Sequence, residues 1–377
     1  MIRRAALVAV LAAVAALGGA VAQAGAKVPY FKHVFIVVLE NENAQTTFGP
    51  DSQAPYLAKT LKHKGAYVPN YYATVHNSLG NYIAMVSGQS PNIQTQADCQ
   101  IYSDISPATS MADGQIFGTG CIYPPGTQMI GNQLGAAGFK WKGYMQDMNA
   151  NAPKGQQSPC RHPAIGEKDP WQKATPTDEY ATRHNPFVYF HSLIDFTRTC
   201  RQHDVDYTHL RQNLKHGKTS PNYALLVPGL CADGHDAPCA NGDPGGLVSA
   251  NRWLRKKMPV ILHSPAYKHR GLLIVTFDEA EATGSEADSS ACCGEKPGPS
   301  IVPPMTPGFL TPGPGGGRVG AVMVSPCIKP GTVSKDKYNH YSLLRSMERN
   351  FKLPYLGYAG QAGLRSFGSD IFTRPGC

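Results

Sequence analysis

The sequence predicts an α/β fold in which a central, mostly parallel sheet is flanked by helices and joined by long loops. Short apolar runs alternate with helix-like segments along the 377 residues, as in chains of βαβ units. The runs 34–39 and 271–277 are almost continuously apolar, which is typical of strands buried on both faces of a sheet. Both runs end in polar side chains, at the sheet edge where α/β folds bind ligands.

The first 24 residues have the pattern of a secretory signal peptide. Arg3 and Arg4 form a basic start, residues 5–21 form an apolar run, and residues 22–24 have the small-x-small form of a cleavage site. The alternative is an uncleaved membrane anchor, for which this alanine-rich run is marginal in length. We therefore expect a secreted or periplasmic protein whose residues 25–377 form one domain.

Charge and cysteine content narrow the class of protein. The formal net charge is +9, so the protein is modestly basic, which favours anionic substrates. The basic residues are dispersed along the sequence, which argues against nucleic acid as a partner. No stable protein partner is implied. The ten cysteines allow up to five disulfides in an oxidising compartment. No CxxC pair is present, which argues against a zinc ribbon. We expect Cys231 to pair with Cys239, and the adjacent Cys292 and Cys293 to bond to different partners.

We predict the helices and strands from the periodicity of apolar residues and from the glycines and prolines that end them. Pro69 places its strand at an edge, Gly65 ends a helix, and Pro259 ends or kinks another. The long loops 89–128, 146–184 and 280–317 lie between core elements, so we interpret them as active-site loops rather than linkers. The expected strands are 33–41, 67–75, 140–145, 223–227, 271–279 and 318–325, and the expected helices are 54–64, 77–87, 130–137, 186–199, 247–258 and 340–351.

Two strand ends carry candidate metal ligands. Glu40 and Asn41 follow the first apolar run, and Asp278 and Glu279 follow the later one. Carboxylate and amide oxygens suit Mg, Ca or Mn, with Zn or Fe as candidates if histidines join them. The alternative is that both pairs are solvated strand ends. Their repetition predicts one shared divalent metal site of uncertain metal identity.

The segment 76–82, His-Asn-Ser-Leu-Gly-Asn-Tyr, opens a predicted helix. A hydroxyl at a helix N-terminus lies where backbone N–H groups and the helix dipole favour an anion. Ser78 is therefore a candidate nucleophile toward phosphorus if a metal lowers its pKa, and Asn81 a candidate donor to the substrate. The alternative is an ordinary helix cap.

Three of the thirteen histidines lie beside acids or amides in loops near element ends: His184, His235 and His340. Each is a candidate metal ligand or proton donor, although a single histidine is more often structural. We assign His340 and His235 to catalysis and His184 to substrate binding.

One glycine-rich segment resembles a nucleotide-binding motif but lacks its context. Residues 315–320 have the spacing of a dinucleotide fingerprint, yet they precede a strand instead of joining a strand to a helix. We interpret them as a flexible loop. No Cys or Ser is followed by x-Pro-x-Arg, so the modified nucleophile of a sulfatase is absent.

Several of these motifs together resemble the bacterial phosphoesterase family, which contains secreted acid phosphatases and phospholipases C and is related to the alkaline phosphatase superfamily. The resemblance covers nearly the whole chain after the leader. Asn77 and Gly80 stand where the family's His-Pro-Ser-Leu-Pro-Asn-Tyr motif has prolines. The motifs are residues 37–41, 76–82, 87–88, 141–145, 184–187, 275–279 and 338–345.

The resemblance implies a function and roles for these residues. The His-Asn-Pro-Phe and Asn-His-Tyr-Ser pieces are similar to the compact acid phosphatase branch, which includes phosphatidylinositol 3-phosphatases. Glu40, Asn41, Asp278 and Glu279 would then hold metal, His340 would lie in the site, and Ser78 would form a phosphoseryl intermediate, with Thr127 as the alternative nucleophile. We expect a secreted metal-dependent phosphomonoesterase of this phosphoesterase family, acting on a phosphate ester such as a phosphoinositide or phospholipid. The alternatives are a phospholipase C-type phosphodiesterase and a non-catalytic phosphoryl-binding protein.

Overall fold

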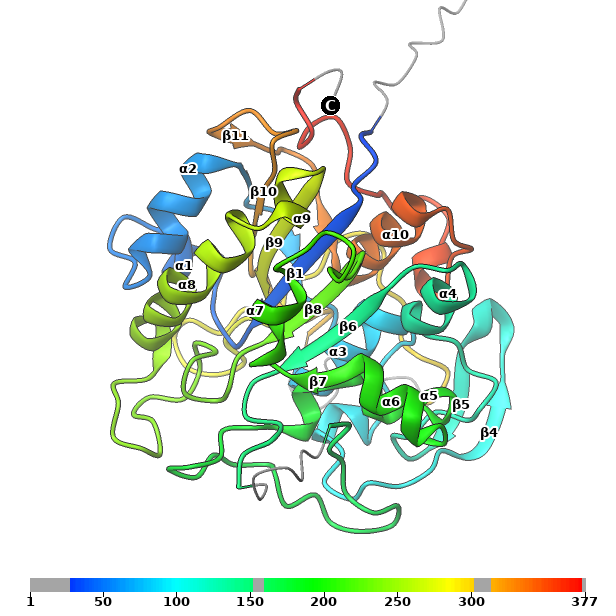
Figure 1. The fold of residues 1–377 in the computed structure, drawn as a ribbon. Coiled ribbons are helices and arrows are strands. Elements are labelled where there is room, and N and C mark those ends of the chain that lie inside the picture. The colour runs from blue at the N-terminus through cyan, green and yellow to red at the C-terminus, as the bar shows by residue number, and fades with distance from the viewer. Residues whose placement is uncertain (1–27, 152–158, 302–312, 375–377) are drawn as a thin grey trace, which may run out of the picture.

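The computed structural model describes residues 28–151, 159–301 and 313–374, so the expected signal peptide lies outside the described residues. The core is an eight-stranded sheet with the order β11-β2-β10-β9-β1-β8-β6-β7 (Figure 1). Strand β10 runs antiparallel to β2 and β9, whereas the other neighbours pair in parallel. The strands are β1 (His33–Leu39), β2 (Ala66–Val68), β6 (Trp141–Met145), β7 (Asp204–Asp206), β8 (Tyr223–Val227), β9 (Gly271–Phe277), β10 (Ala321–Val324) and β11 (Thr332–Val333).

Two small sheets accompany the main one. Strand β3 (Tyr71–Tyr72) pairs with β12 (Tyr338–Asn339), and β4 (Ser106–Ser110) pairs with β5 (Ile116–Thr119). In Figure 1, α1, α2 (Lys62–Lys64), α8 and α9 lie on one side of the main sheet, and α3, α4 and α10 lie on the other. The helices of four or more residues labelled there are α1 (Ala44–Phe48), α3 (Ser78–Ser87), α4 (Ile130–Ala136), α5 (His191–Ile194), α6 (Thr197–His203), α7 (His209–Asn213), α8 (Gly246–Leu262), α9 (Pro265–Lys268) and α10 (His340–Phe351).

Strand β1 is the centre of the sheet. It pairs in parallel with β8 and β9, and Leu39 at its end lies opposite Phe277. All seven residues of β1 and of β9 are buried, as expected for strands covered on both faces. This register carries the residues that follow β1 and β9 to the same edge of the sheet.

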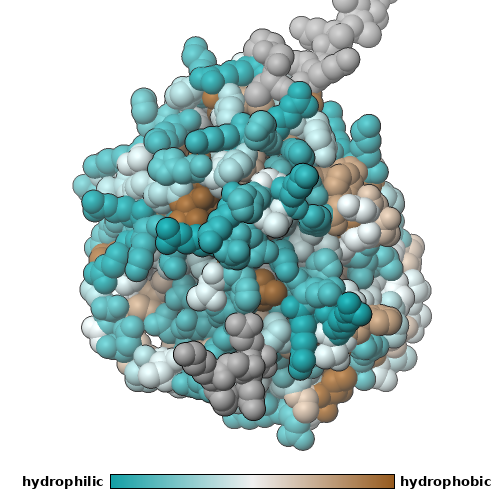
Figure 2. All heavy atoms as spheres, in the orientation of Figure 1, coloured by the Kyte–Doolittle hydropathy of each residue, from teal (hydrophilic) through white to brown (hydrophobic). Residues whose placement is uncertain are grey.

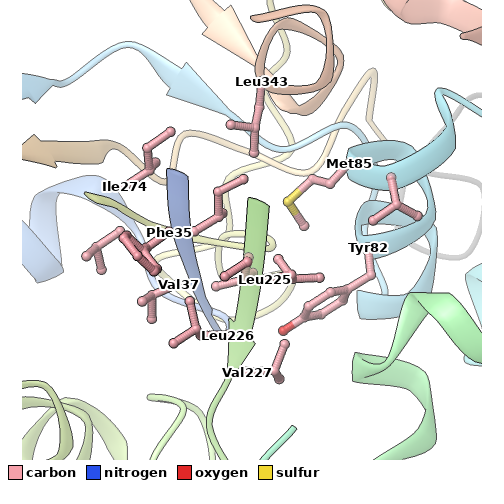
Figure 3. Packing of buried hydrophobic residues seen from close by; sticks show 14 of the residues in the cluster. Phe35, Val37, Tyr82, Met85, Leu225, Leu226, Val227, Ile274 and Leu343 are labelled. Carbon is pink, nitrogen blue, oxygen red and sulfur yellow. The ribbon is translucent and has the colours of Figure 1, made fainter. Parts of the chain in front are cut away.

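The hydrophobic core joins the central strands to the helices over them. Figure 3 shows side chains from β1, β8 and β9 in one cluster with Tyr82 and Met85 of α3 and Leu343 of α10. Burial of such large apolar side chains contributes roughly 1.5–3 kcal/mol each, which fixes α3 and α10 against the sheet. The face seen in Figure 2 is mostly hydrophilic, with apolar residues scattered over it.

Most sequence predictions of elements are confirmed, and three need correction. The expected strand 67–75 is divided into β2 and β3 around Pro69, because proline cannot donate to a ladder. The expected helix 186–199 is divided into η5 (Pro186–Tyr189), α5 and the start of α6. Helix α8 continues past Pro259 to Leu262. Strand β7 was not expected, since it has only three residues.

The disulfides confirm one expectation and contradict another. Cys231 pairs with Cys239 as expected, but Cys292 bonds to its neighbour Cys293, so the prediction of separate partners was wrong. The bond Cys99–Cys121 lies within the loop 89–128, and the bond Cys160–Cys200 joins the loop 146–184 to α6. Cys327 is also disulfide-bonded. Among the helices of the described residues, none has the length and apolarity needed to cross a bilayer.

Candidate active site

Four buried carboxylates gather at one end of the central strands. Glu40 follows β1, Asp278 and Glu279 follow β9, and Asp233 comes from the loop after β8. Their exposed fractions are 1%, 0%, 2% and 0%, respectively. The main chain fixes this arrangement: Glu40 N donates to the Asp233 carbonyl at 2.9 Å, and Asp278 N donates to the Leu39 carbonyl at 2.8 Å. The shared edge predicted from the two acid-tipped strands therefore exists.

The electrostatics of this cluster are unfavourable without a cation. Burial raises the pKa of all four carboxyl groups, and the charge of Glu40 raises the pKa of Asp233, Asp278 and Glu279 further. Buried charges are normally paired or bound to metal, because desolvation disfavours the ionised form. The cluster thus has the composition of a cation site.

Glu40 is the most connected of these groups. Its Oε2 accepts a 2.8 Å hydrogen bond from the hydroxyl of Ser78, and its Oε1 accepts a 3.0 Å bond from the hydroxyl of Tyr82. Nε2 of His184 lies 3.2 Å from the same Oε1. One carboxylate thus joins the end of β1 to the first and second turns of α3 and to the segment that carries His184.

The loop before α3 is anchored to Glu279. Its Oε2 accepts from the main-chain N–H of Asn77 at 3.1 Å and lies 2.6 Å from Nδ1 of His76. Asn77 has a φ of 74°, a left-handed conformation that asparagine tolerates better than most residues. This turn directs Ser78, at the first position of α3, toward Glu40.

The side chain of Asn81 is used within that loop. Its Oδ1 accepts from the N–H of Thr74 and Val75 at 3.0 and 3.2 Å, and its Nδ2 donates to the Val75 carbonyl at 2.6 Å. Asn81 is fully buried. These contacts differ from the donor to substrate expected from the sequence: the amide holds the turn before Ser78.

His184 lies inside the cluster. Its ring stacks on Tyr82 with centroids 5.4 Å apart, and its Nδ1 lies 3.9 Å from Oδ2 of Asp233. Burial, together with the charge of Arg183, holds the pKa of His184 well below its ordinary value. A neutral imidazole is the form that donates a lone pair to a metal, so this placement fits a ligand as well as the substrate contact expected from the sequence.

His340 and His235 occupy contrasting places. His340 is buried, with Nε2 at 2.5 Å from the Asp278 carbonyl and Nδ1 at 3.1 Å from the Tyr71 hydroxyl, and burial lowers its pKa to about 4. Both ring nitrogens contact protein groups, so His340 supports the main chain at Asp278 instead of presenting a free nitrogen for proton transfer. The side chain of His235 is 46% exposed, with Nδ1 3.6 Å from Asp236, so His235 is open to solvent at the border of the site.

Unpartnered buried atoms provide a test of whether a metal fits. Asn41 Oδ1, Asp233 Oδ2, Asp278 Oδ2 and His184 Nε2 are buried without a hydrogen-bond partner in the structure. His184 Nε2 is close to Glu40 but is not oriented to bond to it. Buried polar atoms left unpaired are costly, and three oxygens with one imidazole nitrogen match the ligand preferences of divalent metals. The donor set therefore fits a divalent cation.

A tighter group of potential ligands lies elsewhere. Among the described residues, Cys160, Cys200 and Asp204 are the one set of three whose ligand atoms all lie within 4.8 Å of one another. Cys160 and Cys200 are joined in a disulfide, so their sulfurs are not thiolate ligands. The atoms around Glu40 are spaced more widely, but they are the ones left without partners.

Sequence reasoning missed three residues of the site. Asp233 lies six residues after the end of β8, too far for a strand-end pattern to find it. His76 and Tyr82 were recognised only as parts of the motif 76–82 around Ser78. Two structural signals identify them: β8 is the parallel neighbour of β1, and α3 covers the end of β1 with its first two turns.

Comparisons with known proteins identify the family of this chain. The model of the phosphoesterase family matches residues 51–354. The phosphatidylinositol-3-phosphatase of Mycobacterium tuberculosis is 24% identical over 96% of this chain and 92% of its own length. The phosphate-repressible acid phosphatase of Penicillium chrysogenum is 24% identical over 83% of this chain, which spans 58% of that relative.

Solved structures resemble the fold at low sequence identity. The crystal structure of Ps i-CgsB in complex with k-i-k-neocarrahexaose has a TM-score of 0.51 at 12% identity and covers 92% of this chain and 77% of its own. A protein of the alkaline phosphatase superfamily from Vibrio parahaemolyticus has a TM-score of 0.48 at 12% identity, over 87% of this chain and 68% of its own. The family match extends over most of the sequence and includes α3, β8, β9 and α10, so this protein belongs to the phosphoesterase family.

Proposed function

We propose that this protein is a metal-dependent phosphomonoesterase of the acid phosphatase type, in which Ser78 is the nucleophile. The observation that carries the proposal is the 2.8 Å hydrogen bond from the Ser78 hydroxyl to Oε2 of Glu40, at a helix N-terminus within a cluster of buried carboxylates. A nucleophilic hydroxyl beside a base is the arrangement that covalent catalysis requires. The first-turn N–H groups of α3 favour the negative charge of a phosphoryl group.

The protein residues account for the movement of protons and charge. Glu40 accepts the proton of Ser78 as Oγ bonds to phosphorus, and its raised pKa suits this role. The leaving alkoxide takes a proton from solvent or from the exposed His235. Water then attacks the phosphoseryl group, releasing phosphate and returning the proton to Ser78. His340, through the Asp278 carbonyl, and Asn81, through the turn at residues 74–77, hold this geometry.

The residues that would hold the metal are those with unpartnered atoms. Asn41, Asp233, Asp278 and His184 have them, and Glu40 and Glu279 complete the buried acidic surface around them. When bound there, a divalent cation would neutralise the charge of a phosphoryl oxygen and lower the pKa of a hydroxyl. Oxygen-rich sites suit Mg, Ca or Mn, and the nearby His184 admits Zn or Fe.

The substrate proposed is a phosphate monoester, with phosphatidylinositol 3-phosphate as the specific lipid to test. The support for the lipid is the relative from Mycobacterium tuberculosis, which is similar over nearly the full length of both chains. We also propose that residues 25–377 form one exported domain. The disulfides in the described parts of the chain support export, because such bonds persist in oxidising compartments.

The experiment is hydrolysis of an aryl phosphate before and after chelation. Activity should disappear on exhaustive treatment with chelator and return with one of the five candidate metals. Release of phosphate from phosphatidylinositol 3-phosphate and of diacylglycerol from phosphatidylcholine are measured in parallel. Full activity after chelation excludes the metal role, diacylglycerol release without monoester hydrolysis favours the diesterase, and phosphate binding without any turnover favours a binding protein.

A further inference from the structure

Arg183 precedes His184 in the 3₁₀ turn η4 (Thr182–His184), and the site described above assigns it no role. Its Nη1 donates a 2.7 Å hydrogen bond to the Gln172 carbonyl, and its Nε lies 3.8 Å from Oδ2 of Asp98. The other oxygen of Asp98 accepts a 3.0 Å bond from the N–H of Leu79. One carboxylate thus lies between the guanidinium of Arg183 and the first turn of α3, next to Ser78.

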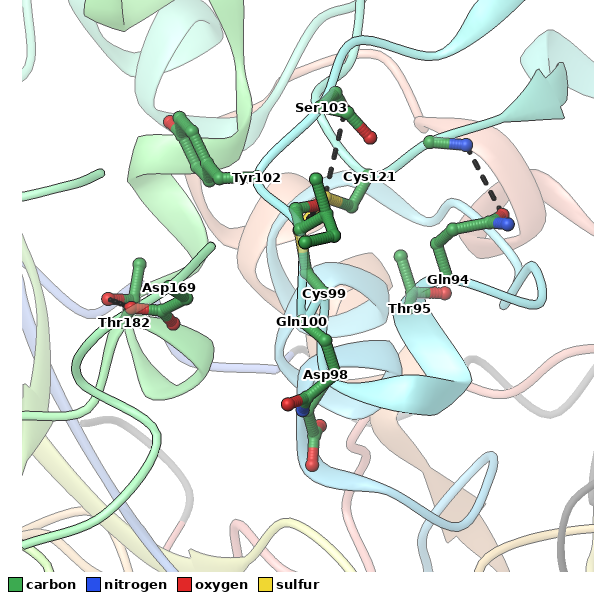
Figure 4. The surroundings of a disulfide bond; sticks show 12 residues. Gln94, Thr95, Asp98, Cys99, Gln100, Tyr102, Ser103, Cys121, Asp169 and Thr182 are labelled. Carbon is green, nitrogen blue, oxygen red and sulfur yellow. Dashed lines mark hydrogen bonds between the residues drawn. A yellow bond between two sulfur atoms is a disulfide. The ribbon is translucent and has the colours of Figure 1, made fainter. Parts of the chain in front are cut away.

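Both partners of Arg183 are held by the long insertions. Asp98 adjoins the Cys99–Cys121 disulfide, and Asp98 and Cys99 have φ angles of 52° and 50°. Figure 4 shows Asp98 below this disulfide, and the Thr182–Asp169 pair to one side of it. Thr182, the residue that precedes Arg183 in the chain, donates a 3.0 Å hydrogen bond from its hydroxyl to Asp169. This bond fixes the position of the main chain next to Arg183. Arg183 is therefore positioned from two separate loops.

The charge of Arg183 acts on the candidate active site itself. It lowers the pKa of Glu40 and of Asp233 against the effect of burial. Burial acts to lower the pKa of Arg183, but Asp98, Glu40 and Asp233 raise it, and the net shift is upward. An always-charged, planar group with several donors is well suited to phosphoryl oxygens.

Arg161 provides an internal comparison. The side chains of Arg161 and Arg183 are both 11% exposed. Arg161 forms a two-pronged ion pair with Asp178 and lies over the rings of Trp171 and Tyr180, so its donors and its face are used. Arg183 instead has a loose 3.8 Å ion pair, and within the described residues its Nη2 makes no hydrogen bond.

We propose that Arg183 is a specificity-determining residue that binds the non-bridging oxygens of the phosphoryl group that Ser78 attacks. It would favour phosphate monoesters, which carry two negative charges, over diesters, which carry one, because attraction to a fixed cation grows with the charge of the anion. This inference rests on the proposed function. Asp98 and Gln172 would serve as positioning residues for Arg183.

The experiment compares Arg183→Gln with the matched control Arg161→Gln. Inorganic phosphate and dimethyl phosphate are titrated into each metal-loaded protein by calorimetry. Arg183→Gln should weaken phosphate binding by about tenfold or more, as expected for loss of a charge-assisted contact, and dimethyl phosphate binding by much less. Arg161→Gln should lower thermal stability and leave both affinities within about twofold of wild type.

Kinetics provide a second readout on the same variants. The kcat/KM of an aryl phosphate should fall in Arg183→Gln, and Arg183→Lys should restore part of it, because a lysine keeps the charge but not the fork. If Arg161→Gln does not fold, Arg161→Lys takes its place. An equal loss for both ligands, or no loss, overturns the role of Arg183. Absence of turnover in the wild type overturns the proposed function, and the phosphate titration still decides the role of Arg183.

Discussion

The hydroxyl of Ser78 lies 2.8 Å from Oε2 of Glu40 and donates a hydrogen bond to it. The two residues are 38 positions apart in the chain, yet one ends the central strand and the other begins the helix that covers it. This pair joins the acidic end of the sheet to the N-terminus of α3. The first prediction below tests this pair, the second tests the acidic cluster around Glu40, and the others test the stability of the fold.

Replacing Ser78 with alanine should reduce kcat for an aryl phosphate by about 10³-fold or more, as loss of a nucleophile does in other covalent enzymes. The measurement is steady-state hydrolysis, together with trapping of a phosphorylated protein by acid quench. Ser87→Ala is the matched control, because Ser87 is also a buried serine of α3 and its hydroxyl bonds, among the described residues, only to the Ile83 carbonyl and the N–H of Gln89. If Thr127→Ala abolishes turnover while Ser78→Ala retains it, the nucleophile is Thr127.

Replacing Asp233 with asparagine should lower metal affinity by about tenfold or more, because it removes an anionic oxygen that has no hydrogen-bond partner among the described residues. The measurement is metal content after equilibrium dialysis, determined by mass spectrometry. Asp206→Asn is the control: Asp206, the last residue of β7, is also buried, but its carboxylate accepts hydrogen bonds from Thr208 and Asn149. Equal metal content in the two variants would remove Asp233 from the ligand set.

Glu348 should make stability depend on pH. Burial raises the pKa of Glu348 in α10 to about 9, and its Oε2 has no hydrogen-bond partner. This pKa is higher than that of a glutamate in the unfolded chain, which is about 4. The protonated Glu348 therefore makes its full contribution to the stability of the fold below about pH 4. That contribution is lost as pH rises through 9.

The test is Glu348→Gln, measured by thermal unfolding at pH 5 and at pH 8.5. At pH 8.5 the variant should have a higher melting temperature than the wild type, by a few degrees for each kcal/mol of added unfolding free energy. At pH 5 the difference in melting temperature should be much smaller. Its amide oxygen preserves the acceptor for the N–H of Leu356. A difference that is the same at both pH values would show that the carboxyl group is not protonated in the folded protein.

The glycine-rich segment before β10 is packed, which corrects its interpretation as a flexible loop. A Cβ on Gly317 would lie 2.0 Å from the Asp288 carbonyl oxygen and 2.6 Å from Ala280, and its φ is 83°. Gly317→Ala should therefore destabilise the fold by about 2 kcal/mol more than Gly138→Ala. Gly138 has a similar φ of 77° but open space around it. Denaturant unfolding of both variants measures the difference, and equal losses would show that φ alone matters.

Local pattern was enough to locate the elements with long, regular periodicity. The strands that precede Glu40 and Asp278 and the helix that begins at His340 agree with the structure within one or two residues, because continuous apolar runs and amphipathic spacing are local signals. Segment 186–199 failed because Phe190 and Phe196 leave the helical conformation and divide it into short turns. The Cys292–Cys293 bond was missed because disulfide pairing is set by three-dimensional proximity.

The sequence by itself determined the fold class, the family motifs and the two acid-tipped strands. Only the tertiary structure decided which side chains meet there. It brought Asp233 to Glu40 through the pairing of β8 with β1, turned Asn81 and His340 to supporting the backbone, and left His235 at the exposed border. The physical reason is that side-chain type is a local property, whereas burial and hydrogen-bond partners depend on the register of the sheet and the helices packed over it.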